Sequence, residues 1–112
     1  LSKCSMALNL SRGLPIKHYS SDRIATLMGN GLLTFVDKKY KFSDFFNKKE
    51  IVEFSSLKDL EEKMNFYKIN TKKRKEIAAN GKRKIFKLFN SRIVCKYIVD
   101  NSLGIKTNFP WK

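Results

Sequence analysis

The segment from Leu32 to Val36, with the sequence LLTFV, is the feature that most limits the folds open to this chain. Almost every residue in it is apolar, so both faces of a strand formed here would be apolar. Such a strand is stable only where other elements cover both faces of its sheet, and covered sheets of this kind are usually parallel. We therefore expect a buried strand over Leu32–Val36 inside an α/β domain.

A short helix is predicted immediately before this strand. Three apolar residues recur at the i, i+3, i+4 spacing of one helix face, and two glycines follow them. Glycine gives the backbone the positive φ with which helices commonly end. The residues concerned are Ile24, Leu27 and Met28, then Gly29 and Gly31.

Further strands and helices are predicted on either side of this unit. No internal repeat or linker interrupts their order, so residues 1–103 are expected to form one domain and residues 104–112 an irregular tail. The alternation of strands and helices predicts an α/β fold with a short parallel sheet, half of a doubly wound domain, finished by C-terminal helices. The predicted strands are Cys4–Leu10 and Ile51–Phe54, and the predicted helices are a short one around Phe42, Phe45 and Phe46, then Leu57–Ile69, Lys72–Phe89, and a last helix capped by Asn90–Ser91.

Two details of the long helices can be predicted. Leu57, Leu60, Met64 and Tyr67 fall on one stripe of the first, which indicates an amphipathic cover for the sheet. Gly81 lies on the inward face of the second, where glycine costs about 1 kcal/mol relative to alanine. Its presence there indicates a close approach of another segment.

Polar residues gather after the first strand and at the start of the first helix. Ligands of open α/β sheets bind outside the carboxyl ends of the strands, where the following helices begin, so this region is the candidate site. Its residues are Asn9, Ser11, Arg12, His18, Ser20, Ser21, Asp22 and Arg23. Structural explanations stay open for them: the serines and Asp22 suit a helix start, Asn9 can satisfy loop backbone, and the arginines can be solvated.

His18 is the only histidine, and no metal-binding pattern surrounds it or the two cysteines. We expect His18 to contact a ligand or the backbone, with a general-base role less favoured. Cys4 and Cys95 are interpreted as small apolar residues of a reducing compartment. No metal or cofactor is predicted.

The net charge is +14, from 24 Lys and Arg against 10 Asp and Glu. This balance is typical of proteins that meet nucleic acid, anionic lipid or a phosphorylated ligand, but a lysine-rich composition bias would produce it too. Basic residues concentrate in the predicted helix Lys72–Phe89, where a solvated face, a nucleic-acid contact and a lipid contact all remain open. They are Lys72, Lys73, Arg74, Lys75, Lys82, Arg83, Lys84 and Lys87.

The order of motifs resembles the C-terminal half of GT-B glycosyltransferases, nearest to the bacterial glycosyl transferases family 1 with CgeB-like C-terminal segments. The resemblance rests on a polar-Arg-hydrophobic helix, on G-x-G-L-L-T-F at Gly29–Phe35, and on R-x-x-I-A-x-x-G at Arg74–Gly81. It implies a Rossmann-like, three-layer domain that binds a nucleotide-sugar and transfers the sugar to a saccharide or other glycan acceptor. It also implies a separate N-terminal domain, without which the chain, beginning at Leu1, would be an inactive fragment.

The resemblance also suggests roles for the candidate residues. Many such enzymes place a glutamate in the helix before the glycine, where it accepts hydrogen bonds from ribose hydroxyls. Setting Gly29 against the family glycine puts Ile24 at that position, so Asp22 is the nearest substitute. Arg23 and the N–H groups of Ser20 and Ser21 would hold phosphate. We expect a cytoplasmic protein that binds no nucleic acid, with peripheral contact to the inner membrane left open and a small basic nucleic-acid-binding domain as the alternative function.

Overall fold

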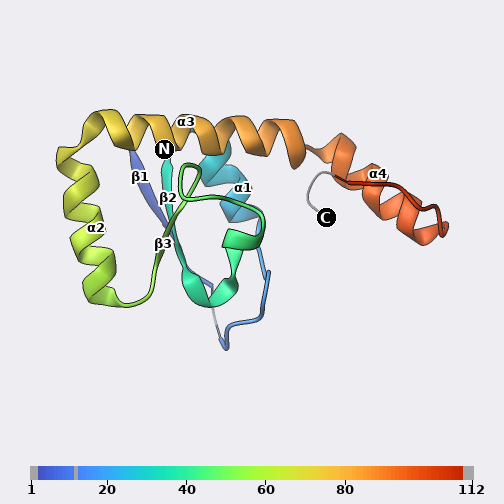
Figure 1. The fold of residues 1–112 in the computed structure, drawn as a ribbon, viewed down its shortest axis with the longest axis horizontal. Coiled ribbons are helices and arrows are strands. Elements are labelled where there is room, and N and C mark those ends of the chain that lie inside the picture. Colours follow the sequence, from blue (N-terminus) through green and yellow to red (C-terminus); the bar gives the residue numbers. More distant parts are fainter. Residues whose placement is uncertain (1–2, 12, 110–112) are drawn as a thin grey trace.

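The computed structural model describes residues 3–11 and 13–109, and it contains a sheet of parallel strands surrounded by helices (Figure 1). The α/β fold predicted from the sequence is confirmed. The elements, in chain order, are β1 (Met6–Asn9), α1 (Asp22–Gly29), β2 (Leu33–Asp37), the short 3-10 helices η1 (Lys38–Tyr40) and η2 (Phe42–Asp44), β3 (Val52–Phe54), α2 (Leu57–Ile69), α3 (Thr71–Leu88) and α4 (Ser91–Ser102).

The strands lie in the order β1-β2-β3, and both pairings are parallel. Met6 stands opposite Leu33 in one pairing, and Phe35 stands opposite Val52 in the other. β2 is therefore the central strand, and its residues from Leu33 to Val36 are at most 1% exposed. The apolar run in the sequence corresponds to the strand that is covered on both faces.

Two apolar clusters lie on the two faces of the sheet. Val36 faces one cluster, to which α1 contributes Ile24 and Met28. Phe35, its neighbour in β2, faces the other, to which α2 contributes Leu60. α3 contributes to both clusters as it crosses one end of the sheet (Figure 1). The result is a three-layer, partial Rossmann-like arrangement with α1 and α2 on opposite faces.

The predicted close approach at Gly81 is present. A Cβ atom built on Gly81 would lie 2.5 Å from the Glu50 carbonyl oxygen and 2.9 Å from Cε of Met28. Glu50 also pairs with Lys84 one turn later in α3, at 2.9 Å between Oε2 and Nζ. The segment before β3 is thus held directly against α3 at the one place where α3 has no side chain.

The predicted caps of α2 and α4 were confirmed, and the prediction for the apolar stripe of α2 was wrong in part. Ser56 and Asn90 cap α2 and α4, since their side chains accept from the N–H groups of Asp59 and Ile93. The glycine with positive φ after α1 is Gly31, at +75°. The stripe predicted for α2 was wrong at two positions: Leu57 is 81% exposed and Met64 is 39% exposed, because α2 meets the sheet through Leu60 and Tyr67.

The C-terminal segment is tied to α4 by Asp100. This carboxylate is 5% exposed and accepts from Lys96 at 2.6 Å and from the Thr107 hydroxyl at 2.8 Å. These hydrogen bonds lower the pKa of Asp100 below its usual 3.8, the Lys96 ammonium having the largest effect. Residues 105–109 have no regular secondary structure. Among the described residues, no helix is both long enough and apolar enough to cross a bilayer.

Stability should therefore decline in acid. The pKa values of Asp44, Asp59 and Asp100 are each lowered on folding, chiefly by hydrogen bonds from His18, Lys63 and Lys96 respectively. The unfolded chain then binds more protons around pH 3.8 and below, so the stabilisation is complete above that pH and is lost as the pH falls through the folded pKa values. Urea unfolding at pH 6 and pH 3 should show a lower free energy of unfolding at pH 3. Asp100→Asn should reduce that difference, and an equal stability at the two pH values would contradict the prediction.

Candidate functional site

The carboxyl end of β1 opens on a surface hollow of about 570 Å³. It is lined by residues from the segment after β1 and from the start of α1. Because the carboxyl ends of parallel strands face one edge of the sheet, this is the position at which open α/β folds bind ligands. The lining residues are Leu10, Ser11, Tyr19, Ser21 and Arg23.

The guanidinium of Arg23 is held at this hollow by a hydrogen bond to the backbone after β1. Its Nη1 atom donates to the carbonyl oxygen of Leu10 at 2.6 Å, which joins the first turn of α1 to the end of β1. Arg23 forms no ion pair with any of the residues that the structure describes. Its positive charge is therefore held beside the hollow without being neutralised.

The N-terminus of α1 carries no side-chain cap. Ser21 occupies the N-cap position with extended backbone, but its hydroxyl accepts nothing from the first turn. The hydroxyl of Ser20 donates to the Ser21 carbonyl at 3.1 Å instead. The first-turn N–H groups, which a capping oxygen would otherwise satisfy, thus lack a side-chain acceptor next to the hollow. Asp22, the acidic residue of this turn, is exposed and is not part of the lining.

Asn9, the last residue of β1, is buried. It is 3% exposed, and its Oδ1 atom has no hydrogen-bond partner. A buried acceptor left without a donor costs free energy, commonly about 1–3 kcal/mol, and a bound water, stored strain or a functional contact can account for such a group. Asn9 precedes Leu10 in the chain, so this acceptor lies one residue from the lining of the hollow.

His18 is directed toward the segment after β2. Its Nε2 atom lies 2.7 Å from Oδ2 of Asp44, and its ring meets the edge of Phe45 with centroids 4.7 Å apart. The hydrogen bond from His18 is the largest cause of the lowered pKa of Asp44, and Lys17 adds to it from 3.5 Å. His18 has a φ of +61°, an uncommon conformation for a residue with a side chain. The pair joins the β1–α1 loop to η2.

Of the eight predicted site residues, the structure brings Ser11, Ser21 and Arg23 together at the hollow. Asn9, Ser20 and Asp22 adjoin that group in the chain, whereas His18 pairs with Asp44. Arg12 lies outside the described residues.

A family model described as glycosyl transferase-like matches residues 1–100 of the 112-residue chain. The chain belongs to the glycosyl transferase-like family. No curated protein and no solved structure matches it. The match covers β1, α1 and the hollow between them together with β2, β3, α2 and α3, so the candidate site lies within the family domain.

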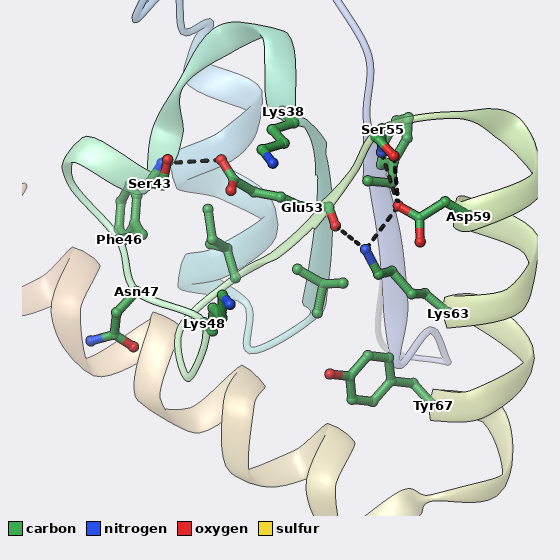
Figure 2. A pocket seen from close by; sticks show the side chains of 13 residues that line it. Lys38, Ser43, Phe46, Asn47, Lys48, Glu53, Ser55, Asp59, Lys63 and Tyr67 are labelled. Atoms are coloured by element: carbon green, nitrogen blue, oxygen red, sulfur yellow. Dashed lines mark hydrogen bonds and ion pairs between the residues drawn. The ribbon is translucent and has the colours of Figure 1, made fainter.

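A second hollow of this glycosyl transferase-like domain, of about 510 Å³, lies beside β3 and was missed by the sequence analysis (Figure 2). Lys63 of α2 reaches across it and donates to the Glu53 carbonyl oxygen at 2.7 Å and to Oδ2 of Asp59 at 2.8 Å. The Glu53 carboxylate accepts from the backbone N–H of Ser43 at 3.1 Å. The i, i+4 spacing of Asp59 and Lys63 predicts their ion pair, but nothing in the sequence predicts the contact with the strand.

The described part of this family member contains no cluster of three or more His, Cys, Asp or Glu that could hold a metal ion. Cys4 and Cys95 are free thiols, and both are exposed, so neither contributes to an apolar cluster. Cys4 lies two residues before β1, and Cys95 lies within α4.

Proposed function

We propose that this chain is part of the nucleotide-sugar-binding domain of a GT-B glycosyltransferase and that the hollow at the end of β1 receives the donor. One observation supports this location above the others. The unneutralised Arg23 and the uncapped N-terminus of α1 adjoin one hollow at the carboxyl edge of the sheet. A nucleotide-sugar carries a diphosphate between two groups rich in hydroxyls, and both features suit it.

The diphosphate would lie at the start of α1. Helix N-termini bind phosphate because unsatisfied N–H groups and the helix dipole act together. Arg23 adds a planar cation that can donate two hydrogen bonds to one phosphate. Its bond to Leu10 uses Nη1 alone and leaves the remaining N–H groups of the guanidinium able to reach the ligand.

The sugar and ribose hydroxyls would be held by neighbouring oxygens. The free Oδ1 of Asn9 needs a donor, and a ligand hydroxyl would supply one. Ser11 and Ser21 can donate or accept from the lining, and Asp22 can accept a hydroxyl from the first turn of α1. His18, held by Asp44, is assigned a contact near the ligand and no proton transfer.

Many related enzymes have a glutamate in the helix before the glycine. Whether the family glycine is aligned with Gly29 or with Gly31, this chain has a neutral residue at that position. Gly31, the glycine with positive φ, is the better match for a helix-ending glycine than Gly29. Moving the alignment by two residues transfers the acidic position from Ile24 to Thr26, whose hydroxyl donates to the Asp22 carbonyl at 3.1 Å. Asp22 therefore remains the carboxylate proposed for the ribose.

The rest of the reaction is assigned to an N-terminal domain of the same protein. That domain would bind the saccharide or other glycan acceptor and supply the catalytic base. We expect the 112 residues alone to be inactive in sugar transfer, since the residues that line the described hollow include no carboxylate.

Replacing Arg23 by glutamine in the full-length enzyme should weaken binding of a nucleoside diphosphate sugar by tenfold or more, because a hydrogen bond to a charged group contributes about 1.5–3 kcal/mol. Isothermal titration calorimetry with a panel of such donors would measure this. Arg92→Gln, at an exposed arginine of α4, is the matched control and should leave affinity unchanged. Equal affinities of the two variants would argue against the proposed site.

Asp22→Ala belongs in the same titration. It should weaken donor binding without unfolding the protein. A stability loss of about 1 kcal/mol with unchanged donor affinity would show that Asp22 acts only as a charge at the helix start.

A nucleic-acid-binding function has less support. Three of the eight basic residues of the α3 segment already have polar partners. Lys84 pairs with Glu50, Arg74 donates to the carbonyls of Tyr67 and Lys68, and Arg83 donates to Oδ1 of Asn80 at 3.4 Å. Lys73 lies over the ring of Phe66 at 5.6 Å.

A further inference from the structure

A third hollow, of about 360 Å³, lies between the segment that leads into β3 and the C-terminal half of α3. It is at the amino end of β3, where α3 crosses the sheet (Figure 1), whereas the hollow at β1 is at the carboxyl ends of the strands. Its volume is near the lower end of the range for ligand sites, about 300–1,000 Å³. Four cations, two amides, one carboxylate and one leucine line it.

Glu50 holds the two walls of this hollow together. Its carbonyl oxygen is 2.5 Å from the position that a Cβ of Gly81 would take, and its carboxylate pairs with Lys84 at 2.9 Å. The same carboxylate oxygen accepts from the backbone N–H of Asn47 at 2.9 Å, which fixes the turn that carries Lys49. Lys49 is therefore held beside the cations of α3 before any ligand binds.

Positive charge is left over in this hollow. Glu50 is the one acid among the lining residues, and its charge is matched by Lys84. Lys49, Arg83 and Lys87 are exposed, and none of the three forms an ion pair within the described part of the chain. Three cations from two segments thus surround one small space without an acidic partner.

The side-chain acceptors of this hollow already have partners inside the chain. Oδ1 of Asn47 accepts from the backbone N–H of Lys49 at 2.8 Å, and Oδ1 of Asn80 accepts from Arg83 at 3.4 Å. Each amide therefore presents its NH₂ group as a donor. The side-chain groups that remain for a ligand are donors and cations, a combination that selects anions.

We propose that this hollow binds a small anion that carries two or more phosphate groups, with inorganic pyrophosphate as the simplest probe. The Arg83 guanidinium can donate two hydrogen bonds to one phosphate, and the ammonium groups of Lys49 and Lys87 match the charge of a second. A single carboxylate would leave most of the positive charge unmatched. Leu88 is the apolar residue of the lining and no aromatic ring lines the hollow, so a nucleotide base would have nothing to stack on. The site is separate from the donor hollow and does not rest on that assignment.

Isothermal titration calorimetry of the full-length protein with inorganic pyrophosphate, at physiological salt, tests this. Pyrophosphate can also enter the hollow at β1, so Arg23→Gln serves as the parent of every variant and keeps that second event weak. The parent should bind pyrophosphate. Adding Lys49→Gln, Arg83→Gln and Lys87→Gln should lower the affinity by about 100-fold or more, because each lost hydrogen bond to a charged group is worth about tenfold.

Two further variants separate a built site from a general effect of charge. Lys3→Gln, Lys58→Gln and Lys106→Gln together remove the same charge at exposed positions outside the hollow and should change affinity by less than about threefold. Arg83→Lys keeps the charge but loses the planar pair of donors, so it should weaken binding by about tenfold.

Circular dichroism would verify that the variants are folded, as their exposed positions and the intact pair of Glu50 and Lys84 should ensure. Equal weakening by the two triple variants, or no loss with Arg83→Lys, would overturn the proposal, because net charge alone would then explain binding. Absence of pyrophosphate binding to the parent would overturn it as well. So would binding of anionic vesicles or RNA in place of pyrophosphate, since the ligand would then be a surface or a polymer.

Discussion

Phe35→Ala should lower the free energy of unfolding by about 3–5 kcal/mol, the range found for large aromatic residues removed from protein cores. Phe35 is 1% exposed in the central strand, and its ring meets the edge of Tyr67 of α2 with centroids 6.2 Å apart. Its removal would leave a cavity between β2 and α2 that neither rigid element can close. A loss of this size is a large part of the total stability of a small domain.

Chemical denaturation followed by circular dichroism would measure the effect of Phe35→Ala. Phe86→Ala is the control, because Phe86 is 61% exposed and its removal should change stability by less than about 0.5 kcal/mol. Similar losses for the two variants would mean that the cluster around Phe35 is not the core of the domain. A variant that fails to fold at all would agree with the upper end of the expected range.

Gly81→Ala should destabilise the chain even though alanine is the better helix former. The new Cβ would lie 2.5 Å from the backbone carbonyl of Glu50, which has no flexible end to move aside. Overpacking of this kind costs about 1–3 kcal/mol, whereas alanine returns at most about 1 kcal/mol within a helix. The net result is a loss, accompanied by displacement of the segment before β3 from α3.

Gly29→Ala provides the matched comparison for Gly81→Ala. Gly29 is the last residue of α1, its φ is not positive, and an added Cβ meets nothing within 4 Å. This substitution should be neutral or stabilising by up to about 1 kcal/mol. If thermal unfolding ranked the two variants in the opposite order, the close approach at Gly81 could not be correct.

Much of the fold was predictable because its elements have clear periodicity. The strand at Leu32–Val36 and the helix at Leu57–Ile69 were located to within one residue, and the parallel pairing followed from an apolar run with no polar face. Gly81 signalled a tertiary contact because a glycine in the middle of a helix has a cost that packing must offset.

The contacts that shape the candidate site were not predictable, because they join loops without periodicity. The bond from Arg23 to the carbonyl of Leu10 and the pairing of His18 with Asp44 link positions 13 and 26 residues apart. Ser21 was expected to cap α1 by residue type, yet its hydroxyl accepts nothing from the first turn. The order of the sequence located the polar residues, but the folded backbone determines which of them line the hollow.

The contact from Lys63 to the Glu53 carbonyl makes the two borders of the sheet unequal. A new strand beside β3 would have to form hydrogen bonds with the backbone of β3. To do so it would have to displace the Lys63 ammonium, which also pairs with Asp59. On the other border, β1 pairs only with β2 within the described chain, and its residues from Met6 to Leu8 are no more than half-buried. Sheet extension is thus directional: new strands can be recruited at β1. In any such extended sheet, Asn9 and Arg23 would be at an internal seam, between the recruited strands and the present ones.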